Sequence, residues 1–197
     1  VNTKVNLNKD GSGTIEETFV MKNEVIKMMQ EFAVMFDSTK TEKFEMFNEE
    51  DLLSKASNFG EGVNYVSGEK FIIDGYEGYK VVYSFSDINK LKLSPSPDDK
   101  IPFGDDLNEG EEKAVDDYLK FNFTKGNPST LVINFPKPQM EEEIKPDSAY
   151  TPIEDSTFTD QMEQKFIEMF DGMKIAIHFN FKDGIDETDA SFVDGSD

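Results

Sequence analysis

The sequence contains no cysteine and no tryptophan, and its only histidine is His178. Without cysteine the chain can form no disulfide, no thiolate zinc site and no cysteine nucleophile. A single histidine also cannot build a histidine-based metal centre or the usual nucleophile–base pairs. Glycoside hydrolysis by two carboxylates normally needs a cleft with aromatic platforms, and tryptophan is absent. We therefore expect a protein that is not an enzyme.

Basic residues are scarce, and long apolar runs are missing. Lys and Arg number 20 against 41 Asp and Glu, which gives a formal net charge of −21. Such a chain repels phosphate backbones and anionic lipid, so we expect no nucleic-acid partner and no basic membrane patch. No apolar run reaches the length of about 18 residues that would span a membrane. The 18 Phe, 6 Tyr and 9 Met nevertheless supply large side chains for a folded core.

Four stretches alternate apolar and polar residues with the period of half-buried strands, and turn residues divide each stretch. The stretches are 1–21 with a turn at 10–13, 63–85 with turns at 67–68 and 74–75, 119–135 with a turn at 125–128, and 175–192 with a turn at 183–184. Each reads as a hairpin or meander. Glu17 interrupts the apolar face of its strand, which predicts a sheet edge or a bulge at that point.

Helical spacing of apolar residues predicts three helices. They cover 24–36 after the cap Asn23, a segment that opens at Asn48 and ends at Gly60, and 160–171 behind a capping box. The predicted fold class is α+β, an antiparallel β-sheet built from hairpins with about three helices packed on one face. We expect one domain, residues 1–197, with long acidic surface loops at about 94–117 and 136–157.

The sharpest motif resembles a calcium loop of the EF-hand type. With Gly13 as the obligatory glycine, the ligand positions of the first half of the loop fall on Asn8, Asp10, Ser12 and Thr14. The position of the bidentate Glu is Phe19, however, and both flanks have strand periodicity. We interpret the segment as a tight turn. A calcium-binding module that uses the Asn8–Thr14 loop or the acidic loops stays as an alternative.

Tyrosines concentrate in one meander, where Tyr65, Tyr76, Tyr79 and Tyr83 lie within 63–85. Core packing with hydroxyls at the rim explains such a cluster. The alternative is a pocket between sheet and helices, which would make the protein a carrier of lipid or another apolar ligand. The paired acids, such as Asp98 with Asp99, have the pattern of solvated surface charge.

Four short segments resemble uncharacterised envelope lipoproteins of Bacteroidetes-type bacteria. They are Asn8–Thr14 followed by a Met-rich helix, Asn58–Val63, Asp74–Tyr79 and Phe192–Ser196. The resemblance implies export, a lipidated cysteine upstream of Val1, and no assigned activity or functional residue. The start at Val1, without Met and already in strand rhythm, agrees with a removed export signal.

These observations together predict a non-enzymatic, extracytoplasmic domain of the lipoprotein type that binds a protein or a small ligand at the cell envelope. We expect it in the periplasm or anchored to the outer membrane, with membrane contact only through the inferred N-terminal lipid. The predicted partner is a protein or an apolar ligand, and no cofactor is expected unless calcium binds.

Overall fold

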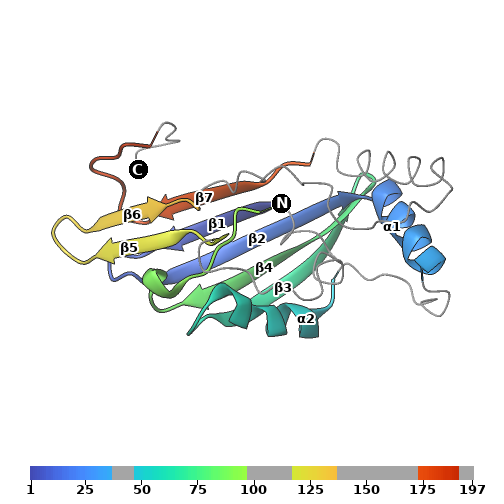
Figure 1. The fold of residues 1–197 in the computed structure, drawn as a ribbon, viewed down its shortest axis with the longest axis horizontal. Helices are drawn as coiled ribbons and strands as arrows, with labels where there is room; N and C mark the ends of the chain where they lie inside the picture. Colours follow the sequence, from blue (N-terminus) through green and yellow to red (C-terminus); the bar gives the residue numbers. More distant parts are fainter. Residues whose placement is uncertain (37–46, 97–116, 137–172, 191–197) are drawn as a thin grey trace, which may run out of the picture. The chain divides into compact units, whose positions relative to one another are not determined.

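The computed structural model describes residues 1–36, 47–96, 117–136 and 173–190. Seven strands form two sheets within these residues. A five-stranded sheet has the order β3-β4-β2-β1-β7, and β5 pairs with β6 in a separate two-stranded sheet (Figure 1). The strands are β1 (Asn2–Leu7), β2 (Gly13–Lys22), β3 (Asn64–Ile73), β4 (Tyr76–Phe85), β5 (Lys120–Thr124), β6 (Thr130–Asn134) and β7 (Ala176–Phe181).

Two α-helices and two 3-10 helices accompany these strands in the described part of the chain: α1 (Asn23–Phe36), α2 (Glu49–Ser54), η1 (Lys55–Phe59) and η2 (Ile88–Lys90). The expected cap at Asn48 is confirmed, because its side chain accepts a hydrogen bond of 3.0 Å from the Glu50 N–H. The expected end at Gly60 is also confirmed, with φ +117°. The helix expected at 160–171 lies outside the described residues.

The expectation of an antiparallel sheet with about three helices packed on one face is wrong. Strand β7 pairs parallel with β1, so the main sheet is mixed, and the hairpin β5–β6 forms its own sheet. Helix α2 has only 6 residues before it tightens into η1. Local periodicity identified these strands but not their neighbours, since the Asn180–Asn6 contact joins residues 174 apart in sequence.

The expected alternation in the first hairpin is confirmed. In β1 the side chains of Thr3, Val5 and Leu7 are buried while their neighbours are more exposed, and Ile15 and Phe19 continue this face on β2. The same face of the sheet carries the core, to which the segments after β4 and before β5 also contribute. The core includes Val5, Leu7, Ile15, Phe19, Leu52, Ala56, Tyr79, Val81, Tyr83, Phe85, Ile88, Leu91, Leu93, Leu119 and Phe121.

Three details of the strands differ from the sequence expectation. Glu17 lies at neither an edge nor a bulge: β2 is an inner strand with continuous register to both neighbours. The expected turn at 67–68 is absent, because β3 runs through it with only a register shift between Tyr65 and Ser67. Residues 186–190, where part of the last strand was expected, are not in a strand.

All described helices and strands belong to one compact unit, residues 1–136 with 175–197, and a second unit covers 137–174. Of the second unit only residues 173 and 174 are described. Within the described residues, no helix combines the length and the apolar character needed to cross a membrane.

Candidate functional site

The loop between β1 and β2 is a hydrogen-bonded turn, as interpreted from the sequence. The Asn8 N–H donates to the Ser12 carbonyl at 2.9 Å, and the Gly11 N–H donates to the Asn8 carbonyl at 3.0 Å. Asp10 Oδ1 accepts from both the Ser12 hydroxyl at 2.6 Å and the Ser12 N–H at 3.0 Å. These two bonds, the hydroxyl bond first, hold the pKa of Asp10 below its usual value.

The structure brings together three of the four candidate calcium ligands. Asn8 Nδ2 donates to Ser12 Oγ at 3.1 Å beside Asp10, whereas Thr14 Oγ1 lies on β2 and accepts from Asn6 Nδ2 at 3.2 Å. Phe19, at the position of the bidentate Glu, is 3% exposed in the core and supplies no ligand. No group of three or more His, Cys, Asp or Glu suited to a metal ion occurs in the described ranges. Calcium binding stays a prediction.

The glycines of this loop are explained by packing. A Cβ on Gly13, which pairs with Leu7 of β1, would overlap the Asn6 backbone oxygen and approach the Phe85 ring. Gly11 has φ +87°, and its Cβ would lie 2.9 Å from the Phe123 ring of β5. The glycine pattern that resembles a calcium loop is therefore required by a tight hairpin under β5.

The outer face of the main sheet is polar. One register row crosses all five strands with Asn180, Asn6, Thr14, Ser84 and Asn64. Asn180 Nδ2 donates to Asn6 Oδ1 at 3.0 Å, so amides bridge neighbouring strands along this row. His178 lies in the next row opposite Lys4 and is exposed, as the sequence predicts. A face of this kind is suited to solvent.

The edge strand β3 differs from that polar face because it exposes large apolar side chains. Val66 is 55% exposed, Ile72 66% and Ile73 58%. Among the described residues, none of the large apolar side chains that are exposed lies on the opposite edge strand, β7. Sheet edges usually carry charges or proline that prevent pairing with another strand. The two charged residues of β3 are Glu69, which is exposed, and Lys70, which forms an ion pair of 2.6 Å with Glu77.

The backbone of β3 is open to pairing over its regular part. Ser67–Ile73 stays in register with β4, and the two-residue turn Asp74–Gly75 closes the hairpin with φ +43° and +85°. In such a hairpin the closing pair exchanges both hydrogen bonds, and bonding then alternates along the strand. The N–H and C=O groups of Gly68, Lys70 and Ile72 therefore point away from β4. No hydrogen bond to these groups is present among the described elements.

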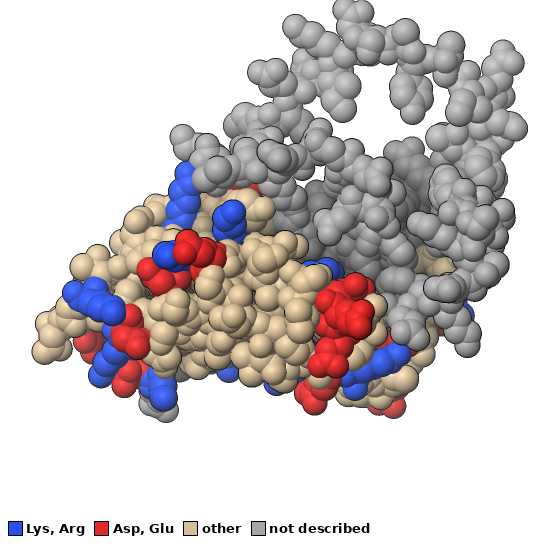
Figure 2. Space-filling view, turned by 90° about the horizontal axis from the view of Figure 1, so that it is seen from below, with Lys and Arg blue, Asp and Glu red and all other residues tan. Residues whose placement is uncertain are grey.

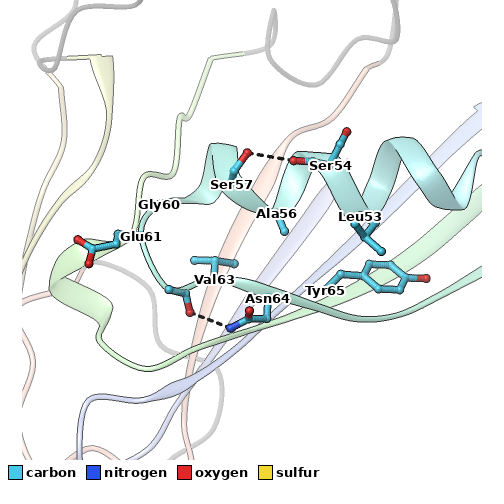
Figure 3. Close-up of a pocket in the computed structure, with 10 residues that line it drawn as sticks. Leu53, Ser54, Ala56, Ser57, Gly60, Glu61, Val63, Asn64 and Tyr65 are labelled. Carbon is cyan, nitrogen blue, oxygen red and sulfur yellow. Dashed lines mark hydrogen bonds between the residues drawn. The ribbon is translucent and has the colours of Figure 1, made fainter.

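An open hollow of ≈ 570 Å³ lies between the α2–η1 segment and the start of β3 (Figure 3). Leu53 and Ala56 point from the helix toward the strand, and Tyr65 extends beneath Leu53 from β3. Leu53 is 59% exposed although it is apolar. The full lining is Leu53, Ser54, Ala56, Ser57, Gly60, Glu61, Gly62, Val63, Asn64 and Tyr65.

Two hydrogen bonds fix the helix that forms one wall of this hollow. The Tyr83 hydroxyl on β4 donates to the Leu52 carbonyl at 2.9 Å, in the core. The Tyr65 hydroxyl donates to Glu49 Oε1 at 2.8 Å at the start of α2. Desolvation, followed by this bond, raises the pKa of Tyr65. The helical wall of the hollow is therefore attached to the sheet by one hydrogen bond in the core and by another at the surface.

The surroundings of the hollow and of β3 are acidic. Residues 49–74 contain six acidic residues and two lysines, a net charge of −4. The acids of α2 fall in its first turn and are exposed, and they are Glu49, Glu50 and Asp51. In the view from the side of α2 and β3, acidic side chains border an uncharged surface, and basic side chains lie beside several of them (Figure 2). A basic ligand would be attracted to this side.

A buried polar group lies deeper, on the core face of the main sheet. Glu17 is 9% exposed and pairs in register with Thr3, which is 1% exposed and whose hydroxyl has no hydrogen bond to the described part of the chain. Desolvation raises the pKa of Tyr79 and of Tyr83, and the Glu17 charge raises both further. Both phenols therefore stay protonated through neutral pH. Tyr79 and Tyr83 thus pack in the core, as interpreted from the sequence, and Tyr65 packs against it, whereas Tyr76 is 40% exposed.

Sequence reasoning missed the edge surface. The turn expected at 67–68 divided β3 into two short strands and hid one strand of ten residues. The available signal was Phe71-Ile72-Ile73, a run without polar alternation directly before the Asp74–Gly75 turn. The helical end Lys55–Phe59 could not be recognised as a pocket wall, because its partner strand was not yet defined.

No family model, no curated protein and no solved structure matches the chain.

Proposed function

We propose that this chain is a non-enzymatic binding domain of the bacterial cell envelope that binds an extended segment of a partner protein along β3. The observation that carries the proposal is an edge strand with exposed Val66, Ile72 and Ile73 and with backbone groups directed away from the sheet. A segment added at such an edge gains main-chain hydrogen bonds, while its alternate side chains contact the edge residues. The envelope location rests on the sequence resemblance.

Pairing of a segment with the β3 edge would be favourable, because it would bury apolar side chains and add hydrogen bonds. Burial of the exposed halves of Val66 and Ile72 contributes about 1 kcal/mol each, given about 1.5–3 kcal/mol for a fully buried aliphatic side chain. The outward groups of Gly68, Lys70 and Ile72 add main-chain hydrogen bonds, each with a net contribution of about 1 kcal/mol. Association costs of similar size offset these gains, so the proposal predicts a reversible complex of moderate affinity.

The test is selection of binders from a library of random peptides of about ten residues, which is long enough to span β3. Peptides selected on the wild-type chain are then measured on the double variant Val66→Lys/Ile72→Lys. The matched control is Val20→Lys, because Val20 is an exposed valine on the inner strand β2, 43% exposed. We expect binding to weaken by about tenfold or more in the double variant and to be unchanged in the control.

Two results would contradict the proposal. One is a selection in which no peptide is enriched on the wild-type chain relative to the double variant. The other is a set of peptides that bind both variants equally, which would place binding away from β3. Circular dichroism of each variant confirms that folding is retained, since all three substituted side chains are more than 40% exposed.

The envelope location is tested separately, by mass spectrometry of the chain purified from the envelope fraction of its native host. We expect a lipid-modified N-terminal cysteine upstream of Val1. Recovery of the chain from the cytosol with an unmodified N-terminal extension would contradict this part of the proposal.

A further inference from the structure

The chemistry of the partner segment follows from the surroundings of β3. Resting on the proposed function, we infer that the bound segment combines apolar and basic side chains on the face that meets α2, with one apolar side chain in the hollow beside α2 and with Lys or Arg facing the acids of α2. The hollow and the edge adjoin, because Asn64 and Tyr65 line the first and begin the second. A strand that extends along β3 therefore passes the opening of the hollow.

The hollow is suited to an apolar side chain. Its helical wall carries Leu53 and Ala56, and Tyr65 provides the opposite wall (Figure 3). Leu53 is 59% exposed, so its contact with an entering side chain removes apolar surface from water.

Charge selects the other side chains of the segment. The two lysines within 49–74 are Lys55 and Lys70, and Lys70 already contacts Glu77. The acids of the first turn of α2, in contrast, stay exposed, and Glu49 is the one acid among them with a tertiary hydrogen bond to a described residue, Tyr65. Lysine or arginine on the partner therefore finds unneutralised carboxylates, whereas an acidic segment meets repulsion from a chain of net charge −21. A second copy of this chain carries the same charge and is disfavoured for that reason.

Three synthetic peptides of about ten residues test the inference by fluorescence anisotropy, since this length matches the strand. They repeat the units Val-Val-Lys-Lys, Val-Val-Glu-Glu and Ser-Ser-Lys-Lys, so that each face of the extended peptide carries both residue types. We expect the Val/Lys peptide to bind about tenfold or more tightly than either of the others. Its affinity should fall as salt is raised from about 0.05 M to about 0.5 M, because screening weakens contacts between exposed charges.

Matched variants separate the contribution of apolar contact in the hollow from the contribution of charge at α2. Leu53→Ala should weaken the Val/Lys peptide several-fold, whereas Val132→Ala on β6, which removes a 49% exposed side chain, should not. The double variant Glu50→Gln/Asp51→Asn should weaken the same peptide and reduce its salt dependence. The control Glu187→Gln/Asp189→Asn removes the same charge from exposed residues that follow β7 and should leave the affinity unchanged.

The outcomes separate this inference from the proposed function. If library peptides bind at β3 but are neutral or acidic, or if Val/Glu binds as well as Val/Lys, the inference is wrong and strand addition stands. If Ser/Lys binds as tightly as Val/Lys, attraction is only electrostatic and the inference is again wrong. If sedimentation shows a dimer that the Val66→Lys/Ile72→Lys variant abolishes, the occupant is a second copy. If nothing binds at β3, both proposals fail.

Discussion

Tyr83 connects the sheet to the helix that forms the hollow, and its replacement by phenylalanine tests that connection. The side chain is 1% exposed, and its hydroxyl donates to the Leu52 carbonyl of α2 at 2.9 Å. Tyr83→Phe keeps the ring and its packing against Phe59 but removes the hydrogen bond. The Leu52 carbonyl then loses this partner in the interior. We expect a loss of about 1–2 kcal/mol in the free energy of unfolding near pH 8.

The pH dependence of the stability difference between wild type and Tyr83→Phe gives a second, independent test of the burial of Tyr83. Burial raises the pKa of Tyr83 in the folded state above its usual value of 10.0, so the folded chain keeps the proton while the unfolded chain loses it. This contribution to stability is fully present below about pH 10 and is lost as the pH rises further. At about pH 11 each tyrosine of this kind lowers the free energy of unfolding of the wild-type chain by about 1.4 kcal/mol. The deficit of Tyr83→Phe should therefore shrink by about 1.4 kcal/mol between about pH 8 and about pH 11.

Tyr79→Phe is the matched control. Burial raises the pKa of Tyr79 in the same way, but its hydroxyl makes no hydrogen bond to the described residues. Near pH 8 this variant should have the stability of wild type, and at about pH 11 it should be about 1.4 kcal/mol more stable. Urea unfolding followed by circular dichroism measures all three chains. A Tyr83→Phe deficit that stays constant with pH, or a Tyr79→Phe deficit as large as that of Tyr83→Phe near pH 8, would refute the reasoning.

Three further predictions concern the turn and the buried carboxylate. Gly13→Ala should lower the free energy of unfolding by about 2–4 kcal/mol, because the added Cβ meets the Asn6 backbone. Gly75→Ala, which has open space around its Cβ, should lower it by only about 1 kcal/mol. Glu17→Gln should lower the pKa of Tyr79 and Tyr83, which ultraviolet titration detects as earlier ionisation; unchanged titration would contradict the assigned cause. Calcium at about millimolar concentration should give no calorimetric heat, since Asp10 Oδ1 already accepts two bonds from Ser12; heat that Asp10→Ala abolishes would restore the calcium hypothesis.

Local features of the fold were predictable from the sequence because short-range chemistry determines them. Alternation identified β1, β2, β4, β5, β6 and β7, and the Asp74–Gly75 dipeptide located a turn whose two residues have positive φ. Asn48 was recognised as a cap because a side-chain amide oxygen can accept from the first turn of a helix. The segment that resembles a calcium loop was also assigned correctly as a turn, from the strand rhythm on both sides of it.

Features that depend on distant residues were not predictable. The parallel pairing of β7 with β1 joins opposite ends of the sequence, and no local pattern encodes it. Glu17 was expected at an edge or bulge, because a charge in an apolar face normally needs solvent, yet inner-strand register places it beside Thr3. The candidate site had the same limitation. Which strand forms an open edge depends on how all the strands pair. The hollow likewise depends on how the α2–η1 segment is placed against β3.

Residue-resolved hydrogen exchange of β3, with and without the Val/Lys peptide, tests the central claim most directly. Strand addition predicts slower exchange at the outward amides of Gly68, Lys70 and Ile72, with no change along the opposite edge strand β7. Exchange at the inward amides, which bond to β4, should change less. Unchanged exchange at Gly68, Lys70 and Ile72 while the peptide is bound, or protection confined to β7, would contradict the account.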